Sequence, residues 1–375
     1  MTLLTELDAA AVTAELDAGW GLPTGTYTDP DWFQLEQEAI FDDAWYYVGT
    51  TLHVPTVGDT LLGWAGRTPV VIVHGRDGEL RALRNVCRHR GHTVCTQSQA
   101  GLKALACPYH GWTYGLDGAL RGAPGSGDEL VDEKADLGLA QLRLETWGNQ
   151  IFVSSAADGP SVTDTFPTLS SVTDRRGFDH DPASYSLHRR YETSIRTNWK
   201  IWYDNTIECY HCGLVHSDTF NAAYAADGEF ETLIHRHLVS FDFPSRPKDG
   251  NELKVSFNRH VHLFPGFLCV QQDDVMIIGQ MRPISATETA MVLDVLAETG
   301  ADPARVDAWA DLWWDTFEED KASVEVVQRN VDSGAPVRNR YIRTQEPVPM
   351  AVTRWAWDAC TSALEARATA TKELQ

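Results

Sequence analysis

The spacing of apolar and polar positions divides the chain into three parts. Residues 1–44 are acidic, and their apolar residues recur at helical intervals behind Asp31, a residue type that caps helices. This pattern predicts a helical N-terminal segment. We expect the segment to pack as an appendage on the larger, C-terminal domain.

The second part, residues 45–155, has the pattern of a small all-β domain. Two apolar runs, 68–74 and 80–86, flank Gly75-Arg-Asp-Gly78, which is a clear hairpin signal. Residues 142–153 return as strand and are expected to close the domain.

The third part, residues 156–375, combines strands with helices. A polar linker is expected first, and strands are predicted at 267–270, 275–281 and 287–296, with helix-like runs before and after them. Helices on both sides of a strand block indicate an antiparallel sheet covered by helices. The chain as a whole is therefore predicted to have an α+β fold.

A long helix near the C-terminus contains one break in its apolar pattern. Asp302-Pro303 is a good helix start and Gly334 a good stop, which gives a helix roughly 45 Å long. Asp320 fills a gap in the apolar stripe, whereas Glu318 and Glu319 are expected to point away from it. The stripe consists of Val306, Trp309, Trp313, Phe317, Val324, Val327 and Val331.

Composition and charge exclude some classes of protein and leave others open. The 375 residues include 31 basic and 53 acidic side chains, for a formal charge of −22, which argues against nucleic acid as a partner. The charge is compatible with a basic protein partner or a cationic substrate. No run is long and apolar enough to span a membrane, and the first residues lack a signal-peptide pattern. Seven scattered cysteines predict reduced thiols or metal ligands in a cytoplasmic protein.

The central candidate for chemistry is the stretch from Asn205 to His216. Glu208 and His211 are three residues apart and would share one face of a helix, whereas His216 would leave that face, so the helix is expected to distort or end near Gly213. Two imidazoles suit a metal ion but need a third ligand from elsewhere in the chain. The Cys-x-x-Cys formed by Cys209 and Cys212 lacks a thioredoxin-like context, and both cysteines are expected to pack around the histidines.

A second candidate cluster lies in the β domain. Seventeen residues separate Cys87-Arg-His89 from Cys107-Pro-Tyr-His110, and each of these two loops offers one thiolate and one imidazole. Two such loops can give two thiolates to one iron and two imidazoles to the other, which is the ligand set of a Rieske [2Fe–2S] centre. The alternative is a structural zinc site, although zinc fingers usually pair cysteine with cysteine and histidine with histidine.

Asp320 is the candidate third ligand of the histidine pair. An unpaired carboxylate in a buried stripe costs several kcal/mol, so Asp320 needs a cation. With His211 and His216 it would complete the two-histidine, one-carboxylate triad of non-heme Fe(II) oxygenases. The alternative is a salt bridge from Asp320 to a buried Arg or Lys.

Taken together, these motifs resemble the oxygenase component of the Rieske non-heme iron oxygenases. The resemblance covers most of the chain, from Glu38 to about Arg329. Glu319-Asp320, followed by Val327-Gln-Arg329, is similar to the family segment that brings the metal carboxylate. The family often has glycine where Asn330 stands, which is a departure at this position.

The resemblance also implies roles that the residues alone do not give. Glu208 would be the acid that bridges His211 and a Rieske histidine of a neighbouring subunit, in a ring of three subunits. Respiratory Rieske proteins have an extra disulfide between the cluster loops. This chain has His92 and Tyr109 at the matching positions, so that disulfide cannot form.

The source of electrons is expected to be another protein. The sequence has no flavin or nicotinamide fingerprint and no further four-cysteine cluster. The implied route runs from NAD(P)H through a separate flavin or iron–sulfur reductase to the Rieske cluster, the mononuclear iron and O₂. A pure electron carrier, the competing interpretation, would need only the β domain and leaves the histidine cluster without a purpose.

The substrate is predicted less sharply than the centres. Glutamate in Glu208-Cys-Tyr-His-Cys-Gly213 is similar to the monooxygenases of carnitine, choline and glycine betaine, whereas aromatic-ring dioxygenases usually have aspartate there. We expect hydroxylation or oxidative N-dealkylation of a small cationic or N-methylated metabolite, with ring hydroxylation as the alternative. A cation–π wall of Trp309, Trp313, Trp314 and Phe317 is one interpretation of the helix, and simple core is the other.

Overall fold

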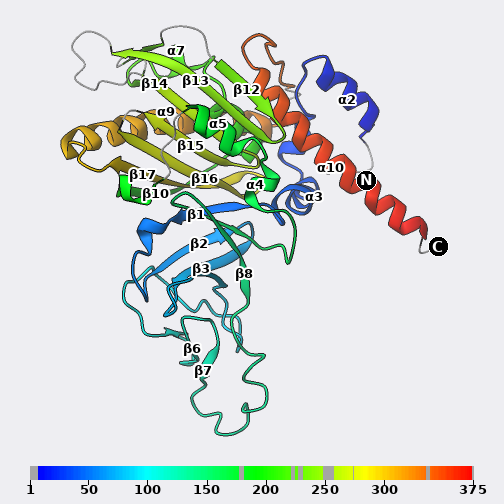
Figure 1. Ribbon diagram of the computed structural model, residues 1–375. Helices are drawn as coiled ribbons and strands as arrows, with labels where there is room; N and C mark the ends of the chain where they lie inside the picture. Colours follow the sequence, from blue (N-terminus) through cyan, green and yellow to red (C-terminus); the bar gives the residue numbers. More distant parts are fainter. Residues whose placement is uncertain are drawn as a thin grey trace. The chain divides into compact units, whose positions relative to one another are not determined.

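The computed structural model describes residues 7–176, 181–220, 224–226, 231–247, 257–272, 274–334 and 338–373. Contacts between Cα atoms divide the chain into two compact units, each of which is described by itself (Figure 1). The β unit comprises Asp42–Thr165 and Asp179–Leu187, and the larger unit comprises Met1–Phe41, Phe166–Phe178 and His188–Gln375. The domain boundaries expected at residues 44 and 155 stay predictions.

The β unit contains a six-stranded and a three-stranded antiparallel sheet. The strand order is β1-β9-β8-β4-β3-β2 in the first sheet and β5-β6-β7 in the second. The strands are β1 (Tyr46–Thr50), β2 (Thr60–Ala65), β3 (Thr68–His74), β4 (Leu80–Arg84), β5 (Leu105–Ala106), β6 (Thr113–Tyr114), β7 (Leu120–Gly122), β8 (Gln141–Trp147) and β9 (Gln150–Ser154). Short helices are η3 (Thr51–His53), α4 (Val162–Thr165) and η4 (Pro182–Ser184).

The predicted hairpin is confirmed, and the closing strand is corrected. β3 and β4 pair antiparallel, and Gly78 in their turn has φ +84°, a conformation that glycine adopts without strain. The single strand expected over 142–153 is instead the hairpin β8–β9, which turns at Gly148 with φ +60°. Gly148, inside an apolar run, therefore marks the turn of a hairpin and not an irregularity within one strand.

The larger unit is built on an eight-stranded antiparallel sheet. Its order is β10-β17-β16-β15-β14-β13-β11, and β12 pairs with β13. The strands are β10 (Tyr185–Ile195), β11 (Tyr224–Ala226), β12 (Glu231–His235), β13 (Leu238–Pro247), β14 (Phe257–Leu263), β15 (Phe267–Gln272), β16 (Val275–Ser285) and β17 (Glu288–Glu298). The helices are α2 (Ala9–Asp17), η1 (Thr24–Tyr27), α3 (Pro30–Glu36), η2 (Gln37–Phe41), α5 (Leu169–Arg176), α6 (Trp199–Thr206), α7 (Cys212–Val215), α9 (Pro303–Asp332) and α10 (Pro347–Glu373). The predicted α+β fold is confirmed.

Helix α9 runs along the large sheet, as Figure 1 shows in yellow and orange. It begins after Asp302, whose side chain accepts a hydrogen bond from the backbone N–H of Ala304, and it ends just before Gly334 with φ +72°. Both ends match the prediction. Its first turns bury Val306, Trp309 and Ala310 against Val270, Val275, Ile277, Val295 and Ala297 of the sheet.

The buried stripe of α9 differs from the prediction near its end. Val327 is 43% exposed, whereas the neighbouring Gln328 is 2% exposed. The Gln328 side-chain oxygen accepts a hydrogen bond of 2.7 Å from the backbone N–H of Asn198, which caps α6. A polar side chain therefore occupies the inner position because it satisfies a buried backbone donor.

The N-terminal segment is tied to α6 through a buried ion pair. Lys200 Nζ lies 2.5 Å from Glu36 Oε1, and Glu36 also accepts hydrogen bonds from the indole N–H groups of Trp32 and Trp199. Lys200 Nζ also donates to the Thr26 carbonyl oxygen at 3.0 Å. Because both charged groups have further hydrogen-bond partners, their burial is tolerable. The N-terminal cap of α3 is Asp29 and not the predicted Asp31, because Pro30 takes the first helical position.

Candidate metal centres and active site

The motif from Asn205 to His216 is a bent link between two short helices. Helix α6 ends at Thr206, and α7 covers only Cys212–Val215, with His211 and His216 at its two caps. The expected single helix through Glu208 to Gly213 is therefore wrong. The break turns His216, five residues past His211, back toward its partner, which a straight helix would not allow.

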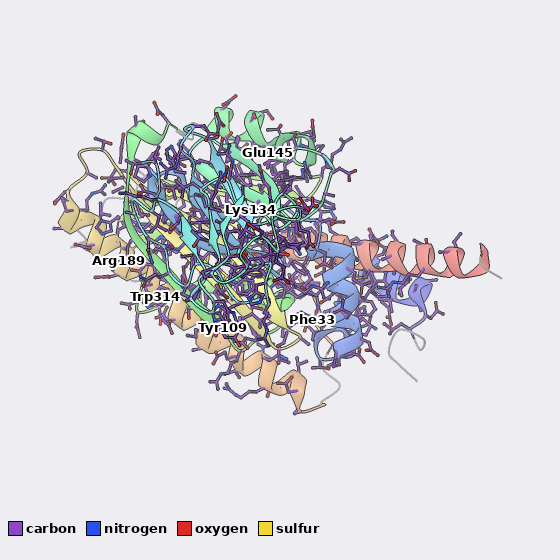
Figure 2. All side chains as sticks on the ribbon, turned by 90° about the horizontal axis from the view of Figure 1, so that it is seen from below. Phe33, Tyr109, Lys134, Glu145, Arg189 and Trp314 are labelled. Atoms are coloured by element: carbon purple, nitrogen blue, oxygen red, sulfur yellow. A yellow bond between two sulfur atoms is a disulfide. The ribbon has the colours of Figure 1, made fainter. Side chains whose placement is uncertain are left out.

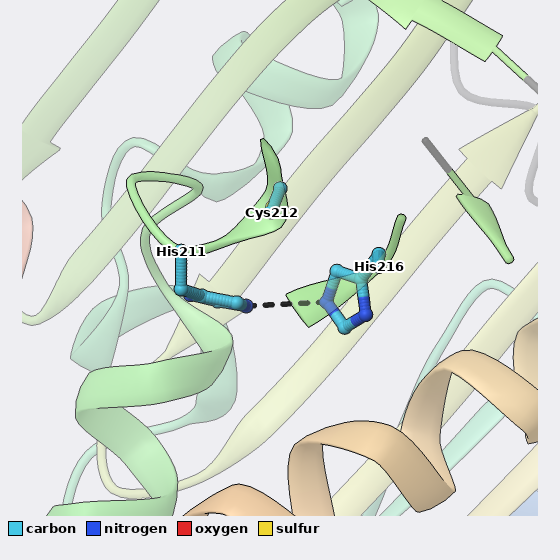
Figure 3. Close-up of side chains that lie close together, drawn as sticks. All are labelled: His211, Cys212 and His216. Carbon is cyan, nitrogen blue, oxygen red and sulfur yellow. Dashed lines mark hydrogen bonds between the residues drawn. The ribbon is translucent and has the colours of Figure 1, made fainter. Parts of the chain in front are cut away.

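Three side-chain atoms of the motif and of α9 form an equilateral triangle. The Nε2 atoms of His211 and His216 are 3.2 Å apart, as the dashed line in Figure 3 marks, and each lies 3.2 Å from Oδ1 of Asp320. An ion about 2.1 Å from each atom would see ligand–metal–ligand angles of roughly 100°. The three atoms could therefore hold one ion together.

Asp320 faces the imidazoles and no Arg or Lys among the described residues. Its Oδ1 atom is buried and lies 3.2 Å from the Nε2 atoms of both imidazoles. Burial by itself would raise the pKa of Asp320, but the two imidazoles outweigh burial and hold that pKa below its usual value. A buried, ionised carboxylate oxygen that faces two imidazole nitrogens in this way supplies the ligand atoms that a metal ion needs. The donor set thus fits a ferrous ion.

Each histidine is oriented by a carboxylate on its other nitrogen. Nδ1 of His211 donates to Glu208 at 2.5 Å, and Nδ1 of His216 donates to Glu319 at 2.9 Å, while Thr219 donates to the same Glu319 oxygen at 2.6 Å. Burial would lower the pKa of His211, but Asp320 and Glu208 raise it to about 9. The expectation that Glu319 points away is wrong. Carboxylates in this position fix the tautomer and aim of metal-bound imidazoles.

The two cysteines of the motif are joined rather than free. Cys209 and Cys212 form a disulfide with their Cα atoms 5.0 Å apart, whereas the sequence predicted two separate cysteines packed around the histidines. The tight turn at the end of α6 places them within bonding reach. The sulfur of Cys212 lies within 4.8 Å of the ligand atoms of both histidines, but in a disulfide it offers no thiolate, so Asp320 remains the better third ligand.

A cavity of about 130 Å³ opens beside the triangle. Trp313, Trp314 and Phe317 of α9 line it, and Tyr191 stacks on Trp314, which is labelled in Figure 2, at a centroid distance of 4.3 Å. Trp309, by contrast, is buried in the contact between helix and sheet. The stripe is therefore divided: Trp309 belongs to the core, whereas Trp313, Trp314 and Phe317 line the cavity, and their role as a cation–π wall stays a prediction.

The cysteine–histidine loops of the β unit are near copies of each other. In each loop the cysteine N–H donates to the carbonyl oxygen five residues on at 2.8 Å, and a glycine N–H returns to the cysteine carbonyl oxygen at 3.0 Å. Gly91 and Gly111 both have φ +72°, which favours glycine. The two turns present Cys87 and Cys107 from equivalent positions.

The loops bring like donors together. The thiols of Cys87 and Cys107 are buried within hydrogen-bonding reach of each other, and burial followed by that contact raises the pKa of Cys107. The rings of His89 and His110 are exposed and lie 4.5 Å apart between centroids. Buried sulfurs on one side and exposed imidazoles on the other fit the two irons of a Rieske cluster. The order of donors differs from that of zinc fingers.

Two residues that sequence reasoning missed support these loops. Asn85 accepts from the backbone N–H groups of Val94 and Cys95 and donates to the Cys95 carbonyl oxygen, so it ties both ends of the first loop together. Tyr114 contacts Cys87 Sγ at 3.2 Å through its hydroxyl, which also accepts from the Arg88 N–H at 3.0 Å. Hydrogen bonds near the sulfur ligands are one means by which proteins tune iron–sulfur clusters.

A fold with two such donor sets defines an iron protein with two centres, and comparisons with known proteins agree. Residues 44–145 match the Rieske [2Fe–2S] domain, and residues 182–362 match the ring hydroxylating alpha subunit (catalytic domain). The glycine betaine monooxygenase oxygenase subunit of Pseudomonas aeruginosa is 34% identical, over 88% of this chain and 86% of the relative. The carnitine monooxygenase oxygenase subunit of Escherichia coli is 27% identical over 84% and 85%.

Solved structures share the fold. A quaternary ammonium Rieske monooxygenase matches with a TM-score of 0.82 and 23% identity over 95% of this chain and 98% of its own. Naphthalene 1,2-dioxygenase matches with a TM-score of 0.76 and 19% identity over 92% and 93%.

The chain belongs to the Rieske non-heme iron oxygenases, as an oxygenase subunit that combines the Rieske domain and the catalytic domain. It is an oxidoreductase that uses a [2Fe–2S] cluster, a mononuclear iron, O₂ and electrons from a separate reductase to oxygenate an organic molecule. None of the helices that the structure describes is long and apolar enough to cross a bilayer.

Proposed function

We propose that this protein hydroxylates or oxidatively N-dealkylates a small quaternary ammonium or N-methylated metabolite. The observation that carries the proposal is the aromatic-walled cavity beside the triangle of His211, His216 and Asp320. The proteins with similar sequences are named as monooxygenases of glycine betaine, carnitine and choline, which supports a cationic substrate over an aromatic one.

The cavity has the groups that replace water around a bound cation, namely aromatic rings and carboxylates. A quaternary ammonium group cannot donate hydrogen bonds, so it is held by aromatic faces and by nearby negative charge. Trp314 stacks on Phe317 at a centroid distance of 5.0 Å, which aligns two rings of α9 along the cavity. Glu208 and Asp320 supply carboxylates at the end where the iron would lie. This combination favours an N-methyl group near the iron.

The proposed ligands divide between the two centres as the donor atoms do. Cys87 and Cys107 would hold one iron of the cluster and His89 and His110 the other, while His211, His216 and Asp320 would hold the mononuclear iron. When bound, the cluster supplies electrons and the mononuclear iron activates O₂ beside the substrate. The chain's own residues orient the imidazoles, exclude water and position the substrate's methyl group.

Glu208 is the proposed link between the centres. One of its oxygens accepts from His211 Nδ1, and the other accepts from the backbone N–H of Tyr210, so the carboxylate is held at the base of the motif. The neighbouring Tyr210 and Leu214 are 60% and 86% exposed, which supports contact with another copy of the chain. We propose a homotrimer in which Glu208 also meets a Rieske histidine of the adjacent subunit.

The proposed electron donor is an NAD(P)H-dependent reductase that carries flavin and an iron–sulfur cluster, in the cytoplasm. Metal analysis and O₂ uptake together test the function. The oxygenase should contain three irons per chain and acid-labile sulfide. With a reductase, it should consume O₂ and release product from glycine betaine, carnitine, γ-butyrobetaine or choline but not from naphthalene. Turnover of naphthalene alone would overturn the substrate class, and zinc without sulfide would overturn the oxygenase.

The role of Glu208 has its own test. Glu208→Gln should retain all three irons and the Rieske spectrum but nearly stop turnover, because the amide cannot take the same proton or bridge two imidazoles as an anion. Glu318→Gln is the matched control, since Glu318 pairs only loosely with Lys321 at 3.6 Å in the described structure. Substantial coupled activity in Glu208→Gln would refute the bridging role.

A further inference from the structure

Polar side chains interrupt the apolar inner face of the large sheet at β14. Because side chains alternate along a strand, Asn258, His260 and His262 share one face, and all three line the cavity. On β15, β16 and β17 the cavity is lined by apolar residues: Leu268, Val270, Ile277, Met291, Leu293 and Val295. Packing of the sheet does not require polar groups at this place, so their presence calls for another reason.

The imidazole of His262 is held in one orientation by stacking. Phe241 of β13 stacks on His260 at a centroid distance of 4.3 Å and on His262 at 5.5 Å, with interplanar angles of 18° and 15°. The rings of His260 and His262 are themselves within 9° of parallel. A ring fixed by its faces keeps the nitrogens at its edge in fixed directions.

Nothing in the described parts of the chain satisfies those nitrogens. His262 is 2% exposed, and both Nδ1 and Nε2 are buried without a hydrogen-bond partner among the described residues. Burial lowers the pKa of His262 to about 3, so near neutral pH the ring is uncharged and has one N–H donor and one acceptor nitrogen. Leaving both unpaired costs free energy, which a ligand in the cavity can recover.

We propose that His262 is a specificity-determining residue that donates a hydrogen bond to an oxygen atom of the substrate, at the end away from the ammonium group. The assignment rests on the proposed function, in which α9 supplies the aromatic wall for the cation. Helix α9 would then bind the ammonium end of the substrate, and His262 of β14 would bind its oxygen-bearing end. The ligand class is a small quaternary ammonium compound that carries a carboxylate or hydroxyl oxygen.

Ligand binding to the iron-loaded enzyme under anaerobic conditions tests the assignment without turnover. Calorimetry compares glycine betaine, choline and tetramethylammonium, of which the last carries the cation without oxygen. The variants are His262→Leu, which removes the donor, and His262→Gln, which keeps an N–H donor. His237→Gln is a control outside the cavity, where the ring packs on Phe264 and Trp355. Iron content is measured for every variant.

His262→Leu should weaken binding of glycine betaine, choline or both by about 10- to 100-fold and leave tetramethylammonium unchanged. His262→Gln should recover most of the loss. A loss confined to glycine betaine assigns the oxygen to a carboxylate, and one confined to choline assigns it to a hydroxyl.

Equal losses for all three ligands, or none, would overturn the assignment. If the wild-type enzyme binds none of the three, the proposed function fails and the assignment fails with it. If it binds them and His262→Leu changes nothing, only the assignment fails.

Discussion

The two candidate iron sites are built in opposite ways. In the β unit, Cys87 and Cys107 lie on two copies of one turn, each closed by its own backbone hydrogen bonds and by a glycine at φ +72°. In the larger unit, His211 and His216 come from a bent link, whereas Asp320 comes from a helix about a hundred residues further along the chain. One site is therefore local in sequence, and the other exists only once the unit has folded.

The difference affects what a single substitution can do. A ligand on a self-closed turn keeps its position even when another ligand is lost. A site assembled from separate elements depends on supporting side chains such as Glu208 and Glu319, which aim the imidazoles. Substitutions in the larger unit should therefore remove one iron selectively, and substitutions near the turns should tune a cluster that stays in place.

The largest effect is expected for Asp320→Ala. Without this carboxylate the two imidazoles are left as the only ligands, which is too few for a stable site. Iron should fall from three to two per chain, turnover should drop to background, and the Rieske absorption spectrum should be unchanged. Full iron content in Asp320→Ala, with Glu318→Gln as the control on the same helix, would show that the triangle is not the metal site.

A smaller loss is expected for Glu319→Gln. The amide still reaches His216 Nδ1 and Thr219, but it lacks the negative charge that orients and polarises the imidazole. Affinity for the mononuclear iron should fall by about 10- to 100-fold, measured by titration of iron-depleted enzyme. An unchanged affinity would reduce Glu319 to a structural contact.

Tyr114→Phe sharpens the comparison on the side of the β unit. The change removes the hydroxyl that contacts Cys87 Sγ and accepts from the Arg88 N–H. Loss of a hydrogen bond to sulfur should lower the reduction potential of the cluster by tens of millivolts with iron content intact, as followed by spectroelectrochemistry. Tyr109→Phe, at an exposed ring, should leave the potential near the wild-type value.

The smallest effect is expected in stability at Asp204, which α6 places partly buried against Tyr341. Burial raises the pKa of Asp204 to about 7 from an ordinary value of 3.8, although the Tyr341 hydroxyl donates to it at 2.7 Å. The folded chain thus holds this proton more tightly than the unfolded chain. The stabilisation is complete below about pH 4 and is lost as pH rises to about 7.

Asp204→Asn should remove that pH dependence. Between pH 5 and pH 8 the wild-type free energy of unfolding should fall by about 3 kcal/mol more than that of the variant. Urea denaturation at the two pH values measures the difference. Parallel changes in both proteins would mean that Asp204 is charged throughout.

Sequence patterns were most informative where chemistry and local geometry coincide. The hairpin around Gly78, the start of α9 at Asp302 and the place of Asp320 in an apolar stripe all follow from short-range rules. A carboxylate in an apolar stripe predicts a nearby cation, because burial of an unpaired charge is costly.

The features that sequence reasoning missed depend on where other elements lie. Glu319 faces His216 only because the break after Thr206 brings α7 against α9, and no spacing rule gives that break. Gln328 replaces Val327 at the inner position because it meets the end of α6. The disulfide between Cys209 and Cys212 also depends on this bend, which brings the two cysteines together. The Cys-x-x-Cys spacing by itself did not predict the bond.

Helix α9 carries both residues of the cavity wall and Asp320, the proposed metal ligand. From Trp313 to Asp320 it rises about 10 Å without interruption. A molecule that presses on the tryptophan rings should therefore also shift the carboxylate of Asp320, the proposed iron ligand. We therefore expect occupation of the cavity to alter the spectrum of an iron held by Asp320, even for a guest that does not contact the iron.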